Sequence, residues 1–211
     1  MPDEDPLLTR QTLLIRLRDS ADDESWAEFA EIYTPLMYGY CQKRELRRED
    51  SADIVQEVMR SVSLALKGFQ YDPEKGKFKG WLFTSLRNAI GNHFRKQSKR
   101  PITAAETRMV EMIENTPDPR ETDDWERDYQ RQLLAWAIEK IKPEFSERIW
   151  IAFEETAIKG RTVDEVAAKL DMTAGALAVA KHRVTKRLKE KAESIDAGRW
   201  EEEMIARAQK V

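Results

Sequence analysis

A basic segment interleaved with aromatic residues implies the clearest chemistry in this chain. Between Lys75 and Arg100 there are eight Lys and Arg residues and no Asp or Glu, although acids outnumber bases 39 to 36 over the whole sequence. Such a surface neutralises phosphates, and the counterions it releases give affinity for nucleic acid of any sequence. The aromatic residues in the segment are Phe78, Trp81, Phe83 and Phe94. Because unpaired bases stack on such rings, the segment favours single-stranded or distorted DNA as well as duplex DNA; a solvated helix face beside core aromatics is the alternative.

The sequence contains few residues that could support nucleophilic or metal-dependent chemistry. Cys41 is the only cysteine, and His93 and His182 are the only histidines, so disulfides and Cys/His zinc sites are excluded by count. Cys41 lies in an aromatic helical stretch, where we expect a buried structural thiol rather than half of a Cys–His nucleophilic pair. The chain also lacks the phosphate-cradling motif GxxxxGK[ST]. We therefore expect no catalytic residue, no metal site and no cofactor.

The bulk composition favours small, well-solvated helical domains. The 211 residues are 41% hydrophobic and 36% charged, which suits one large or two small domains. No apolar run approaches the roughly 20 residues of a membrane span, and the acidic start of the chain lacks the basic-then-apolar order of a signal peptide. We therefore expect a cytoplasmic protein without membrane insertion.

Helical periodicity runs through almost the whole chain and predicts an all-α fold of two small domains. In the first domain, residues 1–100, apolar residues follow helical spacing over 26–40, with Pro35 a candidate kink. A second helix, capped by Asp50 or Ser51, carries its apolar stripe through Leu66. Residues 69–80 contain Pro73, Gly76 and Gly80 and predict a loop, after which a further helix continues into the basic tail.

The charge then inverts between the two domains. From 101 to 128 the sequence holds nine acids and three arginines, and it is interrupted by Pro101, Pro117 and Pro119. This composition predicts an acidic linker over 101–125, which competes with DNA for the basic patches of the protein. A second helical domain is expected over 126–192, followed by a C-terminal extension, 193–211, to which no role is assigned.

The second domain contains the pattern of a helix-turn-helix. Thr162 and Glu165 have the spacing of a capping box, and a short apolar-faced helix follows them. Asp171, Met172 and Thr173 form a tight turn in which Thr173 caps the next helix. The free face of that helix is basic and includes Lys181, His182, Arg183, Lys186 and Arg187. This is the geometry for entry into a DNA major groove, and a plain helical hairpin with a basic surface is the alternative.

Three ordered segments resemble the extracytoplasmic-function (ECF) group of sigma-70-type bacterial transcription initiation factors. Residues 53–59 (DIVQEVM) resemble the helix by which region two of that family binds core RNA polymerase. Residues 69–88 (FQYDPEKGKFKGWLFTSLRN) are similar to the loop and helix that open and read the minus-ten promoter element. Residues 160–188 resemble region four, which reads the minus-thirty-five element.

The resemblance implies a role for each matching residue. The polar face opposite the apolar stripe would bind the polymerase, and its residues are Asp53, Gln56, Glu57 and Arg60. Minus-ten recognition and melting would use Lys77, Phe78, Lys79, Trp81, Arg87, Asn88 and Arg95. Minus-thirty-five recognition would use Thr173, Lys181, His182, Arg183 and Lys186. The recognition helix departs from the family at Ala178, Ala180 and Lys181, where basic residues and a leucine are common.

The implied function is that of a sigma factor: it binds core RNA polymerase and directs promoter-specific initiation, including DNA melting. Core polymerase and promoter DNA are the expected partners, and an anti-sigma factor is left open as a third. The polymerase supplies the chemistry, so we expect no enzyme activity. Two rival classes are a helix-turn-helix regulator that acts without polymerase, and a helical enzyme or adaptor. The first needs neither the aromatic loop nor the 53–60 polar face, and the second does not account for the segregated basic residues.

Overall fold

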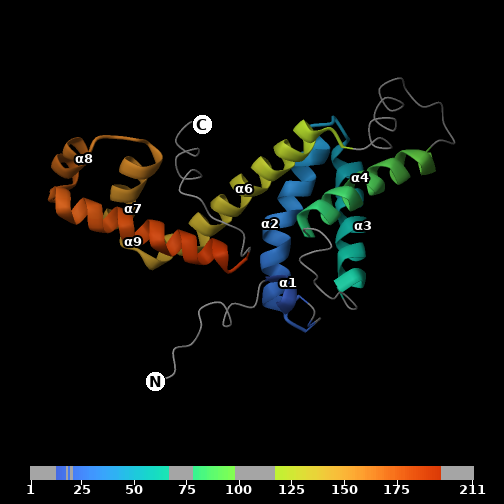
Figure 1. Cartoon of the computed structure of the whole chain (residues 1–211), viewed down its shortest axis with the longest axis horizontal. Helices are drawn as coiled ribbons and strands as arrows, with labels where there is room; N and C mark the ends of the chain where they lie inside the picture. The colour runs from blue at the N-terminus through green and yellow to red at the C-terminus, as the bar shows by residue number, and fades with distance from the viewer. Residues whose placement is uncertain (1–12, 18, 20, 67–77, 98–116, 196–211) are drawn as a thin grey trace. The chain divides into compact units, whose positions relative to one another are not determined.

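The computed structural model describes residues 13–17, 19, 21–66, 78–97 and 117–195. These residues form helices and turns with no β-strand among them, which confirms the predicted all-α fold (Figure 1). The chain divides into two compact units. The first spans Leu14–Tyr129, and the second covers the described residues from Gln130 onward. None of the described helices combines the length and the apolar character needed to cross a membrane.

The first unit is built on three long helices that follow a short one. The short helix is α1 (Leu13–Arg16), and the long ones are α2 (Asp23–Gln42), α3 (Arg48–Leu66) and α4 (Phe78–Gln97). Asp22 caps α2 by accepting a hydrogen bond from the Ser25 backbone N–H at 2.9 Å, and α2 continues through Pro35. A predicted 26–40 helix is thereby confirmed and extended at both ends.

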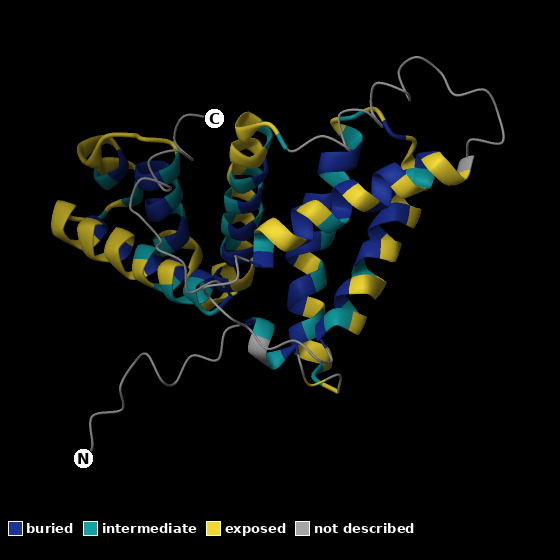
Figure 2. Ribbon diagram, turned by 45° about the vertical axis from the view of Figure 1, so that its right-hand side comes forward, coloured by how far each residue is buried: buried dark blue, intermediate teal, exposed yellow. Residues whose placement is uncertain are grey.

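The core of the first unit lies where α2, α3 and α4 bury their apolar stripes, coloured dark blue in Figure 2. The fully buried side chains include Phe29, Ile32 and Met37 from α2, Ile54 from α3, and Leu82, Leu86 and Ile90 from α4. The stripe predicted on α3 is buried at Val55, Val58, Val62 and Leu66, while Met59 is half-buried. Periodicity therefore assigns the core face of α3 correctly.

The start of α3 differs from the prediction. The helix begins at Arg48, so neither Asp50 nor Ser51 is its cap. Ser51 lies in the first turns, fully buried, where its hydroxyl donates to the Arg47 carbonyl at 2.8 Å. The same hydroxyl accepts from the Gln42 amide at 2.8 Å, so Ser51 ties the end of α2 to α3.

The start of α4 also differs, because Phe78, Lys79 and Gly80 are helical rather than part of the predicted 69–80 loop. Phe78 is 5% exposed, and its ring lies 5.9 Å from the rings of both Phe29 and Tyr33. Burying a phenylalanine contributes roughly 1.5–3 kcal/mol, which exceeds the roughly 1 kcal/mol that a helical glycine costs. The remainder of the predicted loop lies outside the described residues.

Helix α6 (Pro119–Ile141) begins inside the segment predicted as a linker. Pro119 suits the first helical position, where a missing N–H costs nothing, and Asp118 accepts from the Arg120 backbone N–H at 2.8 Å. Trp125, Tyr129 and Leu133 recur every four residues and are at most 3% exposed. The acidic sequence from 119 therefore opens a helix whose apolar stripe begins at Trp125. Most of the predicted linker, residues 101–116, lies outside the described residues.

The second unit contains the remainder of α6, a 3-10 turn η2 (Lys142–Glu144), α7 (Glu147–Phe153) and a π-helical turn η3 (Glu154–Ile158). Helices α8 (Val163–Leu170) and α9 (Ala174–Glu193) follow. The predicted buried positions of α9 are all buried: Leu177, Ala180, Val184 and Leu188. On α8, Val166 is buried, whereas Val163 at the start of the helix is 45% exposed.

Candidate nucleic-acid interface

The polar face of α3 is open to solvent. Its four residues Asp53, Gln56, Glu57 and Arg60 are all exposed, while the opposite face of the helix is buried. The Lys96 ammonium of α4 lies 3.9 Å from the Glu57 carboxylate, and both side chains stay largely exposed. Leu64, 64% exposed, follows Arg60 by one turn and adds an apolar side chain to the same face. This face was predicted from the sequence, and Leu64 was not.

One edge of α4 presents an aromatic ring and amides. Trp81 is 38% exposed, and Asn88 and Arg95 follow it at intervals of two turns, both exposed. Thr84 and Asn92 share this edge, because they lie between these residues at helical spacing. The Arg95 guanidinium donates to the Asn92 amide oxygen at 2.9 Å. The sequence reasoning missed Thr84 and Asn92, although counting in turns from Trp81 finds both.

The other edge of α4 is largely covered, and three of the predicted DNA contacts lie on it. Phe78 is a core residue. Arg87 is 2% exposed and donates to the Glu121 carboxylate of α6. The Lys79 ammonium lies 2.7 Å from the Glu126 carboxylate and 4.4 Å from the centre of the Tyr129 ring. In this structure Phe78 is packed in the core, and Lys79 and Arg87 are paired with carboxylates of α6. Lys77, the remaining predicted contact, lies outside the described residues.

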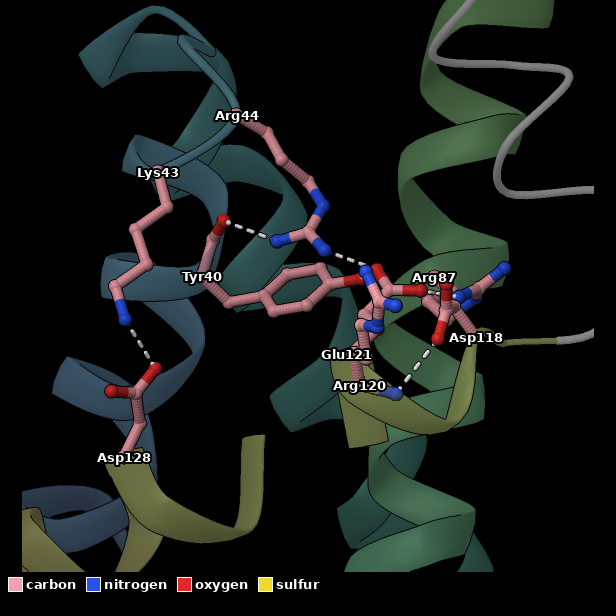
Figure 3. A network of polar contacts seen from close by, with 8 residues as sticks. All are labelled: Tyr40, Lys43, Arg44, Arg87, Asp118, Arg120, Glu121 and Asp128. Atoms are coloured by element: carbon pink, nitrogen blue, oxygen red, sulfur yellow. Dashed lines mark hydrogen bonds and ion pairs between the residues drawn. The ribbon is translucent and has the colours of Figure 1, made fainter. Parts of the chain in front are cut away.

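Glu121 is the centre of the polar network that covers this edge (Figure 3). Its carboxylate accepts hydrogen bonds from Arg44, from Arg87 and, at 2.5 Å, from the Tyr40 hydroxyl. The Arg44 guanidinium also lies 3.4 Å from the centre of the Tyr40 ring. Burial and the hydrogen bond to Glu121 raise the pKa of Tyr40 far above its usual value, so its hydroxyl remains a donor. Nearby, Lys43 of α2 pairs with Asp128 of α6 at 2.6 Å.

Cys41 is confirmed as a buried structural thiol. Burial raises the pKa of its thiol to about 12, and the charge of Arg44 opposes this shift only in part. The thiolate needed for nucleophilic attack is therefore not formed near neutral pH.

The two helix caps that the sequence predicted at the start of α8 and at the start of α9 are both present. In the capping box, the Thr162 hydroxyl accepts from the Glu165 N–H at 3.4 Å, and the Glu165 carboxylate accepts from the Thr162 N–H at 3.3 Å. Thr173 is exposed, and its hydroxyl accepts from the Ala176 N–H at 3.1 Å. Asp171 has a left-handed backbone, with φ of 49°, that reverses the chain.

Arg148 of α7 holds this turn in place, a role that sequence reasoning missed. Its guanidinium donates to the Leu170 carbonyl at 2.7 Å and to the Asp171 carbonyl, the two acceptors at the end of α8. A cation at a helix C-terminus also meets the negative end of the helix dipole. Arg148 and Leu170 are 22 residues apart, so no local pattern marks the pair.

The free face of α9 is basic over its middle turns. Lys181, His182, Arg183 and Lys186 are all exposed. Arg187 is not free, because it makes two hydrogen bonds, of 2.6 and 2.9 Å, to the Glu144 carboxylate, which raise its pKa. The first turns of the face are small or apolar and include Ala178 and Val179, the latter 59% exposed.

Two comparisons with known proteins point to the same class of protein. Residues 29–100 match the sigma-70 region 2 family, and these residues include the exposed faces of α3 and α4. The chain is also similar to a curated relative, the ECF RNA polymerase sigma factor BldN of Streptomyces coelicolor. The two are 21% identical over 188 residues, which cover 89% of this chain and 67% of the relative.

The matched region and this relative both support the sequence resemblance to the ECF sigma factors of the sigma-70 family. They likewise support a sigma-factor role in transcription initiation. Sigma factors in general are not enzymes, which agrees with the expectation from the sequence.

Proposed function

We propose that this protein binds core RNA polymerase through the polar face of α3 and directs promoter-specific initiation, including DNA melting. The observation that carries the proposal is the division of α3 within the matched region. Asp53, Gln56, Glu57 and Arg60 are exposed together, although the core needs only the opposite face. A charged, hydrogen-bonding face that the fold does not use suits a partner protein, and the exposed Leu64 adds an apolar anchor.

The exposed edge of α4 supports a role in strand opening. Unstacking a base step costs a few kcal/mol, which a stacking or wedging side chain offsets. Trp81 is exposed, and Asn88 lies two turns further along the same edge of α4. The Asn88 amide has the donor and acceptor needed to bond a base edge. Arg95 supplies a cation for the phosphates on the same edge. These three residues remain our proposed minus-ten contacts.

The exposed basic face of α9 supports recognition of an upstream duplex element. A short turn joins α8 to α9, with Thr173 capping α9 and Arg148 bonded to the end of α8, and such a connection suits a helix-turn-helix. We assign Lys181, His182, Arg183 and Lys186 to DNA contact. Thr173 caps α9 by accepting a hydrogen bond from the Ala176 N–H, so its hydroxyl can contact DNA only through the proton and the lone pair that this bond leaves free.

Run-off transcription tests the whole proposal. Core RNA polymerase, with and without this protein, is incubated with a library of genomic fragments, and the transcript ends are sequenced. We expect discrete start sites that appear only when both proteins are present, preceded by two shared sequence elements. DNA binding without any polymerase-dependent transcript would contradict the proposal and favour a regulator that acts without polymerase.

A further inference from the structure

The first part of α6, residues 119–129, covers one face of the first unit, and we call it the acidic clip. Two aromatic side chains anchor it. The Trp125 ring stacks on Phe83 of α4 with 5.2 Å between ring centres, and the Tyr129 ring stacks on Tyr33 of α2 at 5.6 Å. Trp125 is 3% exposed and Tyr129 is fully buried. The clip is thus a docked helix rather than an extended connection.

Acidic side chains of the clip are matched to cations beneath it. Glu121 bonds Arg87 of α4 and Arg44 of α2, and Glu126 lies 2.7 Å from the Lys79 ammonium of α4. The clip as a whole has five acids and two arginines, a net charge of −3. Lys79 and Arg87 belong to the basic segment whose composition predicts DNA binding.

We propose that the acidic clip is an autoinhibitory element: it occupies the phosphate-binding cations of α4, with Glu121 as its central contact, and DNA displaces it. The inference rests on the proposed function, since it takes promoter DNA to be the ligand of α4. Carboxylate and phosphate oxygens make the same charge-assisted hydrogen bonds to guanidinium and ammonium groups. The clip and a DNA backbone therefore compete for Lys79 and Arg87.

We call the state with the clip docked on the first unit closed, and the state with the clip displaced open. The anchoring of the clip explains why the closed state predominates in the free protein. Opening exposes Trp125 and Tyr129 and leaves Arg87 without its carboxylate, so the open state is a minor one. When only a fraction of molecules is competent to bind, the apparent affinity falls by that fraction. The clip thereby keeps the free protein off arbitrary DNA while leaving the edge bearing Trp81 exposed.

Two double variants of equal charge separate this device from a general effect of acidic residues. Glu121→Gln with Glu126→Gln removes the two carboxylates that hold Arg87 and Lys79. Asp123→Asn with Asp124→Asn removes two carboxylates from the exposed side of the same helix. Each full-length variant is titrated, without polymerase, into fluorescent duplex and single-stranded DNA of arbitrary sequence over a range of salt concentrations.

We expect the first variant to bind DNA several-fold more tightly than wild type. Its plot of log affinity against log salt should steepen by about two, because the two cations of α4, Lys79 and Arg87, become available to phosphates. The second variant should differ little from wild type. An equal gain in both variants would overturn the proposal in favour of diffuse electrostatics. Because polymerase is absent, the result does not depend on whether the wild type directs transcription.

Hydrogen exchange over residues 119–129 completes the test. The clip amides should exchange faster in the Glu121→Gln, Glu126→Gln variant, and faster in wild type when DNA is added in excess. Faster exchange without a gain in DNA affinity would show that the clip does not block DNA binding, and would overturn the proposal. Unchanged exchange and unchanged affinity in that variant would overturn Glu121 as the central contact.

Discussion

The Arg87 guanidinium lies 5.7 Å from the centre of the Phe83 ring and donates to the Glu121 carboxylate. Its side chain is 3% exposed, whereas Arg95 on the other edge of α4 is exposed. Removing Arg87 deletes one of the two cations paired with the partly buried Glu121 carboxylate, which leaves Arg44 alone to compensate it. We therefore expect Arg87→Ala to lower the free energy of unfolding by about 3 kcal/mol, and Arg95→Ala by less than about 0.5 kcal/mol.

Urea unfolding of both variants, followed by circular dichroism, checks this difference. Equal stability of the two variants would mean that Arg87 is not held by Glu121 in solution. The comparison also bears on DNA, because Arg95→Ala should weaken DNA binding while leaving the fold intact.

Cys41 gives a prediction that depends on pH. Its pKa in the folded protein is raised from 9.0 to about 12, so the folded state favours the protonated thiol. That contribution to stability is complete below pH 9 and is lost as the pH rises toward 12. At pH 8 we expect iodoacetamide to label Cys41 slowly in native protein and rapidly in urea, as followed by mass spectrometry. Equally rapid labelling in both states would contradict the burial of the thiol.

At the scale of helices, the sequence predicted those features that depend on residues close together in the chain. The polar and apolar faces of α3 follow from spacing within one helix, and the capping box at Thr162 follows from two residues three positions apart. The roles of Lys79 and Arg87 did not follow, because their partners Glu126 and Glu121 are 47 and 34 residues away. Composition marks a basic segment, but it does not show which of its cations another helix covers.

Helices α4 and α9 should have separable roles, since only α4 pairs an exposed aromatic ring with amides. Trp81→Ala should reduce strand opening, seen as lost permanganate reactivity of unpaired thymines, more than it reduces closed-complex formation. Arg183→Ala should do the reverse. If Trp81→Ala left melting intact and Arg183→Ala left upstream recognition intact, the proposed division between the helices would be wrong.

On α9 itself, we expect Arg183 to read a base and Lys186 to hold a phosphate. Arg183→Ala should then cost about 1–3 kcal/mol and relax sequence preference at one upstream position. Lys186→Ala should weaken binding to all sequences alike and reduce the salt slope by about one. Affinities of a set of single-base operator variants, measured at several salt concentrations, distinguish the two. A uniform loss for Arg183→Ala would assign it to the backbone instead.

For the whole molecule, the arrangement of charge matters more than its sum. The net charge of −3 disfavours contact with DNA, while the exposed edge of α4 ends in a cation, Arg95, and the face of α9 is basic. The acidic residues of the clip lie against four of the cations in the first unit, Lys43, Arg44, Lys79 and Arg87. A protein built in this way should bind promoter DNA weakly alone and well when the polymerase holds it there.

The affinity of core RNA polymerase for a charge-reversed α3 face tests the central claim most directly. The variant Asp53→Lys with Glu57→Lys is compared with Asp123→Lys with Glu139→Lys, which reverses two exposed acids outside α3. Helicity and melting temperature should stay close to wild type in both. We predict that the α3 variant binds polymerase at least about tenfold more weakly, as expected when close charge pairs at an interface become repulsive, and that the control binds normally. Wild-type affinity in the α3 variant would contradict the account.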